Sequence, residues 1–210
     1  MNIVFDLGAV LLEWQPAALV AQSFPAQTGS PAAAQALAKN LFGHADWHAF
    51  DRGVLAMDAV IARSAERLQL PLRDLQTLVE GIGGYLRPMA ESLALLETLR
   101  ELRQRKAGVS GLYFLSNMPL PYARSLEREH AFFGWFDGGL FSGDALQVKP
   151  EPEIYLQLQN RYQLAPASTL FIDDLQGNID AARALGWRGI HFVSAAQLRA
   201  ELAPLLDSLA

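Results

Sequence analysis

Short apolar segments recur along the chain, and longer segments with helical periodicity separate them. The short segments are rich in Val, Ile, Leu, Phe or Tyr and end in Gly, Asn, Asp or Ser, which is typical of buried strands. Strands are expected at residues 2–5, 111–115, 139–141, 169–172 and 188–193, and helices at residues 89–105, 120–130, 152–162 and 178–185. Strands that alternate with helices predict an α/β fold with a Rossmann-like parallel sheet.

The chain from residue 16 to residue 85 departs from this alternation. It is rich in Ala, Leu and Gln, and Gly and Pro divide it into several amphipathic helices. Ser30 and Pro31 are expected to begin one of these helices as its N-cap and first-turn residue. We therefore expect a small helical cap domain of residues 16–85, inserted after the first strand of a core formed by residues 1–15 and 86–210.

Composition limits the classes of partner. The 210 residues carry a formal net charge of −5, which gives no reason to expect a nucleic acid or an anionic membrane surface as partner. There is no cysteine, so disulfides, thiolate metal sites and a cysteine nucleophile are excluded. No signal peptide precedes the first strand, and no apolar run approaches the roughly 20 residues that span a bilayer. We expect a cytoplasmic monomer or homodimer that acts on a small molecule.

Polar side chains follow the predicted strands at the edge where ligands bind in parallel sheets. Carboxylates from two strand ends attract Mg²⁺, which prefers oxygen ligands. A phosphate bridges such a metal, while an ammonium, a hydroxyl and backbone N–H groups hold its other oxygens. Each residue alone has an ordinary structural explanation as a turn, cap or surface residue; their common placement favours a site. They are Asp6, Ser116, Asn117, Lys149, Asp173 and Asp174.

Four segments resemble the haloacid dehalogenase-like hydrolase superfamily. They are FDLGAVL from Phe5, FLSNMP from Phe114, VKPEPEIY from Val148 and FIDDLQGNIDAARALGW from Phe171. The first segment, together with residues 50–53 and 87–88, is similar to the branch of α-D-glucose-1-phosphate phosphatase and the N-terminal phosphatase domains of epoxide hydrolases. The resemblance implies a magnesium-dependent phosphatase that hydrolyses a small phosphate ester, with a sugar phosphate such as glucose 1-phosphate as one candidate.

The resemblance also implies roles for the residues around the transferred phosphoryl group. Asp6 is expected to be the catalytic nucleophile that forms an aspartyl-phosphate. Ser116 and Asn117 are expected to bind the phosphoryl group, and Lys149 to stabilise its charge.

The same resemblance implies a metal-binding site for Mg²⁺. Asp174 is expected to be the main acidic ligand beside Asp6, and Asp173 to act directly or through water. The backbone carbonyl of Gly8 is expected to supply a further contact. Most phosphatases of the superfamily carry a second aspartate where this chain has Gly8, and that residue protonates the leaving group. General acid–base help is typically worth about 10²–10⁴-fold in rate, so another donor or an easier leaving group is needed.

Several residues of the expected cap are candidates for that donor or for contacts with the substrate. His48 has the most useful ordinary pKa for proton transfer. Packing or solvation explains each candidate equally well. The donor candidates are Glu13, His44, His48 and Asp51, and the contact candidates are Trp14, Arg52 and Arg87.

Three other functions remain open. A 2-haloacid dehalogenase would use Asp6 on carbon and needs no metal, so the paired acids at 173–174 argue against it. A catalytically weakened member would bind a phosphate or a partner protein because Gly8 removes the acid. A phosphoglucomutase depends strongly on that missing acid and is disfavoured.

Overall fold

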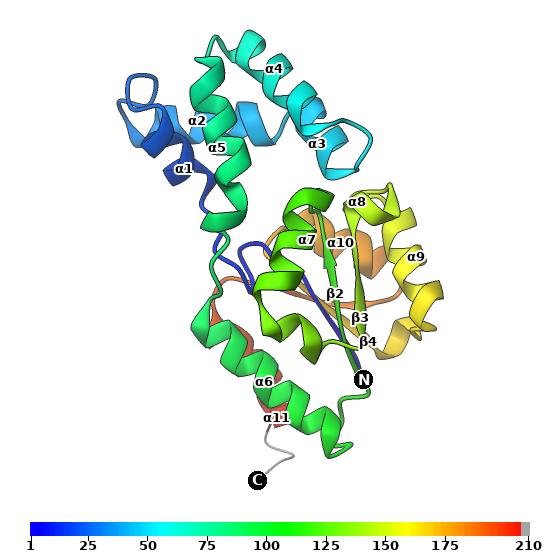
Figure 1. The fold of residues 1–210 in the computed structure, drawn as a ribbon. Helices are drawn as coiled ribbons and strands as arrows, with labels where there is room; N and C mark the ends of the chain where they lie inside the picture. The colour runs from blue at the N-terminus through cyan, green and yellow to red at the C-terminus, as the bar shows by residue number, and fades with distance from the viewer. Residues whose placement is uncertain (207–210) are drawn as a thin grey trace.

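A five-stranded, all-parallel sheet forms the centre of the computed structural model, which describes residues 1–206 (Figure 1). The strand order is β3-β2-β1-β4-β5, so β1 lies in the middle. Ile3 of β1 pairs with Leu112 on one side and with Leu170 on the other. The predicted α/β fold with a parallel sheet is therefore confirmed. The strands are β1 (Asn2–Phe5), β2 (Gly111–Ser116), β3 (Gly138–Phe141), β4 (Thr169–Asp173) and β5 (Arg188–His191).

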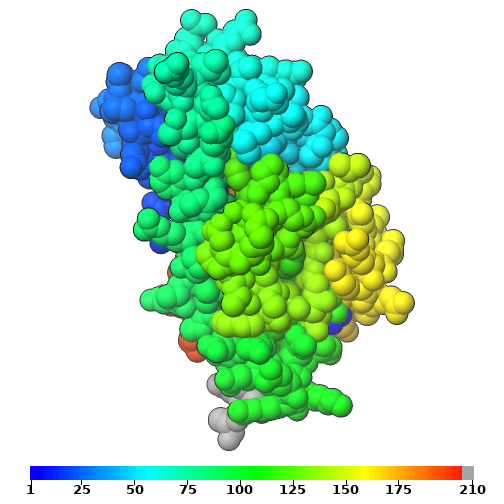
Figure 2. All heavy atoms as spheres, viewed as in Figure 1, coloured from blue at the N-terminus to red at the C-terminus, as the bar shows by residue number. Residues whose placement is uncertain are grey.

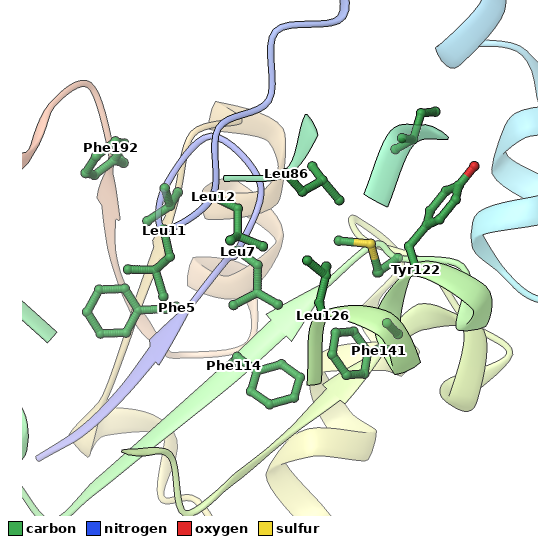
Figure 3. Close-up of a cluster of buried hydrophobic side chains, with 14 of the residues drawn as sticks. Phe5, Leu7, Leu11, Leu12, Leu86, Phe114, Tyr122, Leu126, Phe141 and Phe192 are labelled. Carbon is green, nitrogen blue, oxygen red and sulfur yellow. The ribbon is translucent and has the colours of Figure 1, made fainter. Parts of the chain in front are cut away.

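Side chains alternate along each strand and build one hydrophobic layer on each face of the sheet. Ile3 and Phe5 point into the layer beneath α6, α7 and α11, whereas Val4 points into the layer beneath α9 and α10. Figure 3 shows part of the first layer, where Phe114 and Phe141 lie below Leu126. The covering helices are α6 (Ala90–Gln104), α7 (Leu120–Glu129), α9 (Pro152–Tyr162), α10 (Gln176–Ala184) and α11 (Ala195–Leu206).

Residues 16–85, called the helical insert below, lie together beyond the carboxyl ends of the strands (Figure 1). In Figure 2 the cyan atoms of the insert lie directly against the green and yellow atoms of the core. Ser30 accepts a hydrogen bond from the Ala33 N–H at 3.2 Å, so the predicted N-cap is confirmed. The helices are α1 (Pro16–Ser23), α2 (Pro31–Phe42), α3 (Ala45–Asp51), α4 (Met57–Leu68) and α5 (Leu72–Tyr85).

The two connections between the core and the insert run side by side. The Glu13 N–H donates to the Arg87 carbonyl at 2.7 Å, and the Met89 N–H donates to the Leu11 carbonyl at 2.9 Å. The chain therefore leaves and re-enters the core at one place, directly after the first strand and its loop.

Three short or irregular elements are not evident from the sequence pattern. Helix α11 contains Pro204, yet it forms because Leu198 and Leu202 are buried in the layer that it shares with α6. The short helix α8 (Ser142–Ala145) and the 3₁₀ helix η1 (Ala131–Trp135) also go unpredicted. Within residues 1–206, no helix is both long and apolar enough to cross a membrane.

Leu99 of α6 is fully buried in the first hydrophobic layer, so its truncation tests that layer. We predict that Leu99→Ala lowers the free energy of unfolding by about 2–5 kcal/mol, because it leaves a cavity. Leu156→Ala is the matched control, since Leu156 is 38% exposed; we expect a change within about 0.5 kcal/mol. Urea denaturation measures the free energy of unfolding of both variants. Equal losses would show that packing of Leu99 on α6 does not stabilise the hydrophobic layer.

Candidate active site

Side chains from three neighbouring strands meet at the carboxyl edge of the sheet. Asp6 directly follows β1, Ser116 ends β2 and Asp173 ends β4, and the parallel register places these ends next to one another. Asp6, Ser116, Lys149 and Asp174 line one cavity of about 240 Å³. The structure therefore brings the predicted strand-end residues together around a common space.

The Lys149 ammonium is buried at the floor of this cavity. Its Nζ lies 2.8 Å from the Asp6 carboxylate and 2.7 Å from that of Asp173, and it donates to the Leu115 carbonyl at 2.9 Å. These contacts use all three donors of an ammonium. Burial alone would lower the pKa of Lys149, but Asp173 and Asp6 outweigh it, so the pKa is raised and the lysine stays charged.

Asp173 is held in place by hydrogen bonds and supports the residues around it. It is fully buried and accepts hydrogen bonds from the Leu175 N–H at 2.8 Å and from the Asn178 amide at 2.9 and 3.0 Å, in addition to Lys149. Asn178 is a site residue that the sequence pattern does not single out. The one available signal is its place in the first turn of the helix after the acidic pair.

Asn117 lines the cavity, and its side chain binds the main chain of Lys149. Its side-chain amide donates to the Lys149 carbonyl at 3.0 Å and accepts from the Lys149 N–H at 2.8 Å. Both ends of the amide are therefore occupied by the main chain of Lys149. The Asn117 side chain fixes the loop that carries the lysine, while the buried Ser116 hydroxyl faces the cavity.

Three carboxylates crowd one corner of the cavity. Oxygen atoms of Asp6, Asp173 and Asp174 lie within 4.8 Å of one another. The pKa of Asp6 is raised to about 7, because burial and the neighbouring carboxylates of Asp173 and Asp174 together outweigh the lowering by Lys149. Burial and Asp173 also raise the pKa of Asp174. A hard divalent cation would relieve the repulsion among these carboxylate oxygens. The three side chains therefore fit Mg²⁺ as a set of ligands.

Gly8 lies two residues after Asp6 and lines the same cavity. A Cβ atom at this position would lie 3.8 Å from the Trp14 Cβ, which is an ordinary contact. A Cβ therefore fits at Gly8, although the chain has no acid there.

The rest of the cavity wall is largely apolar and comes from both the insert and the core. Of the candidate proton donors, His48 and Asp51 line the cavity, whereas Glu13 and His44 do not. Arg52 instead forms a two-point ion pair with Glu151. The apolar lining, which sequence reasoning largely missed, consists of Trp14, Phe42, Trp47, Ile82, Leu86, Met118, Pro119, Tyr122 and Leu175.

A buried lysine between two aspartates, with a serine at the end of the neighbouring strand, defines an enzyme site at a sheet edge. The chain belongs to the haloacid dehalogenase-like hydrolase family, whose model matches residues 2–186. The predicted superfamily is therefore confirmed, and the protein is a hydrolase.

Similar proteins include both phosphatases and dehalogenases. A sesquiterpene phosphatase, astK of Aspergillus oryzae, is 28% identical over 97% of this chain and 95% of its own. A Bacteroides thetaiotaomicron HAD family enzyme, bt-2542, solved with magnesium and inorganic phosphate, is 19% identical with a TM-score of 0.67, over 90% of this chain and 92% of its own. The L-2-haloacid dehalogenase of Xanthobacter autotrophicus is 18% identical with a TM-score of 0.64, over 99% and 86%. These two structural likenesses show the fold alone.

The buried ammonium offers a direct test of the site's electrostatics. We predict that Lys149→Met lowers the free energy of unfolding by about 3–5 kcal/mol, because it leaves two buried carboxylates without their cation. Lys39→Met, at an exposed position on α2, is the control. Denaturation in metal-free buffer measures both variants. Equal stability of the two would show that the ion pairs do not organise the sheet edge.

Proposed function

We propose that this protein is a magnesium-dependent phosphatase that hydrolyses a phosphate monoester through an aspartyl-phosphate on Asp6. The observation that carries the proposal is the contact between Asp6 and the Lys149 ammonium beside two further carboxylates, all at the carboxyl edge of the sheet. With a divalent cation on the carboxylates, this arrangement would suit an anionic group that bears several oxygens better than a neutral substrate.

The chain's own residues have distinct parts in the proposed reaction. One Asp6 oxygen is held by Lys149 and by the Leu7 N–H at 2.7 Å, which leaves the other free to attack phosphorus. The Ser116 hydroxyl is placed to donate to an equatorial phosphoryl oxygen, and Lys149 stabilises the negative charge near the nucleophile. Asp173 holds Lys149 in position.

Mg²⁺ would be held by the Asp6 and Asp174 carboxylates and by the Gly8 carbonyl, with Asp173 acting through water because its oxygens are already bonded. When bound, the ion neutralises charge on the carboxylates and the phosphate. The phosphatase relative and the solved magnesium–phosphate complex of a structural neighbour support this assignment.

The cavity wall favours an apolar organic group over a sugar. Trp14, Phe42, Trp47, Phe50 and Tyr122 form a series of edge-to-face contacts with centroids 4.7 to 5.8 Å apart. All but Phe50 line the cavity, and away from the sheet edge the polar side chains of the lining besides Tyr122 and the tryptophans are His48 and Asp51. The relative named as a sesquiterpene phosphatase agrees with a hydrocarbon group of this kind.

Dehalogenation is the second candidate, since a dehalogenase shares the fold. The cluster of three acidic side chains counts against it, because displacement of halide from carbon needs no metal. We rank it below phosphate ester hydrolysis for that reason.

The nucleophile is tested with a chromogenic ester. We predict that the protein hydrolyses p-nitrophenyl phosphate only when Mg²⁺ is added, and that Asp6→Asn abolishes turnover because an amide cannot attack phosphorus. Asp74→Asn, at an exposed position on α5, serves as the control and should match the parent. Release of halide from 2-chloropropionate without metal, or turnover by Asp6→Asn, would contradict the proposal.

The organic group is tested by comparing esters with different tails. We predict a higher kcat/KM for octyl phosphate than for glucose 1-phosphate. Phe42→Ala should lower kcat/KM for octyl phosphate about tenfold, because apolar contact is lost, while methyl phosphate changes by less than about threefold. Leu72→Ala, at an exposed position outside the cavity, is the control. A parallel loss on both substrates would refute the assignment of the tail to the aromatic wall.

A further inference from the structure

Among the described residues at the sheet edge, none is assigned to give a proton to the departing oxygen in the proposed reaction. Gly8 stands where an acid would be expected, and Lys149 is fully engaged by three acceptors. We infer that Asp51, from the helical insert, is the general acid and base of the reaction, a step that rests on the proposed phosphatase function. Asp51 ends α3 and lines the cavity that also contains Asp6, Ser116 and Lys149.

Contacts with the core fix the end of α3 above the cavity. The Ser142 hydroxyl donates to the Asp51 carbonyl at 2.5 Å and accepts from the Met118 N–H at 2.8 Å. Met118 lies two residues after Ser116, so a single hydroxyl joins Asp51 to the segment that carries the phosphate-binding serine. The acid is therefore positioned by the core, although it belongs to the insert.

Arg52 and Gly53, which follow Asp51, also contact the core. The Arg52 guanidinium pairs with Glu151, two residues after Lys149. Gly53 has φ +80°, and a Cβ there would lie 2.8 Å from the Gly143 carbonyl oxygen. Only glycine allows this close approach of insert and core. Residues 51–53 thus attach the end of α3 to helix α8 and to the segment that precedes α9.

The surroundings of Asp51 suit a carboxyl that carries its proton. Its residue is 9% exposed and lies among aromatic side chains, and no ion pair within residues 1–206 includes it. Burial raises the pKa of Asp51 to about 8, and a hydrogen bond with the Trp47 side chain acts in the opposite direction. The titratable groups around it are His48 on its own helix, Tyr122 on α7, and Asp6, Lys149 and Asp174 on the cavity wall.

The proton balance of the two steps follows from this protonation state. As Asp6 forms its bond to phosphorus and the ester P–O bond breaks, the Asp51 carboxyl gives its proton to the departing oxygen, and an alcohol leaves. Asp51 is then a carboxylate. It takes a proton from the water that attacks the aspartyl-phosphate, the Asp6 P–O bond breaks, and phosphate and the protonated acid are restored.

His48 is the competing donor on the same cavity wall. It lies one turn earlier on α3 and is exposed, and none of the hydrogen bonds described for residues 1–206 fixes its imidazole ring. Asp51 is held at its backbone by the core and is shielded from water, which favours it as the positioned acid.

Two esters of nearly the same shape separate proton donation from binding. Phenyl phosphate releases a basic oxygen that needs a proton, whereas p-nitrophenyl phosphate releases a weakly basic one. We expect Asp51→Asn to lower kcat/KM for phenyl phosphate about 10²-fold or more and for p-nitrophenyl phosphate by no more than about tenfold. His48→Asn tests the competing donor, and Asp74→Asn, at an exposed position on α5 outside the cavity, is the matched control that should alter both by less than about threefold. The parent's kcat/KM for phenyl phosphate should fall above pH 8 as Asp51 loses its proton.

Several outcomes decide the inference. Equal losses on both esters, unchanged rates in Asp51→Asn, or a selective loss in His48→Asn would overturn it. Absence of Mg²⁺-dependent turnover in the parent would instead refute the phosphatase function.

At pH 8, Asp51→Asn should unfold at the same temperature as the parent protein or at a higher one. The pKa of Asp51 is raised in the folded protein, so ionisation of this buried acid opposes folding as pH rises from about 4 to 8. Gly8→Asp combined with Asp51→Asn should restore part of the phenyl phosphate rate, since a Cβ fits at Gly8.

Discussion

The buried ammonium of Lys149 is the interaction on which the rest of the site depends. Its three hydrogen bonds end on Asp6, on Asp173 and on the Leu115 carbonyl, so one cation joins the carboxyl ends of β1, β4 and β2. Asn117 holds the lysine's main chain from the end of β2, and Asn178 holds Asp173 from α10. The sheet edge is thus a polar network in which each buried charge has partners, and this satisfaction makes such a network tolerable inside a protein.

The same network explains why the carboxylates can be so close. Asp6 and Asp174 both have raised pKa values, because burial and mutual repulsion outweigh the single lysine. Additional positive charge near Asp6 would lower its pKa and favour the ionised carboxylate. A divalent cation would provide that charge and a phosphate would then balance it, so that binding of metal and of substrate should favour each other.

Strand positions and strand-end residues could be read from the sequence because both depend on local patterns. A buried strand followed by a polar residue fixes Asp6, Ser116 and Asp173 without knowledge of their neighbours. The use of the Asn117 amide could not be predicted, since its partner is a loop backbone 32 residues away. The apolar lining of the cavity could not be predicted from the sequence for a similar reason. Which face of each helix in the insert meets the core depends on docking, and amphipathic periodicity does not specify the opposing surface.

In the proposed reaction, two buried aspartates of one cavity have opposite requirements, and the side chains around each of them suit its proposed role. Asp6 must be ionised to attack, and it lies 2.8 Å from a lysine and next to a metal-ligand set. Asp51 must be protonated to donate, and aromatic side chains surround it without a cation partner among the described ion pairs. Residues of identical chemistry thus become nucleophile and acid through their surroundings. The insert contributes most of the apolar environment, so one wall would both contact the proposed organic group and favour a proton on Asp51. In the proposed reaction the chain would thus replace the acid that is missing at Gly8 with one from the helical insert.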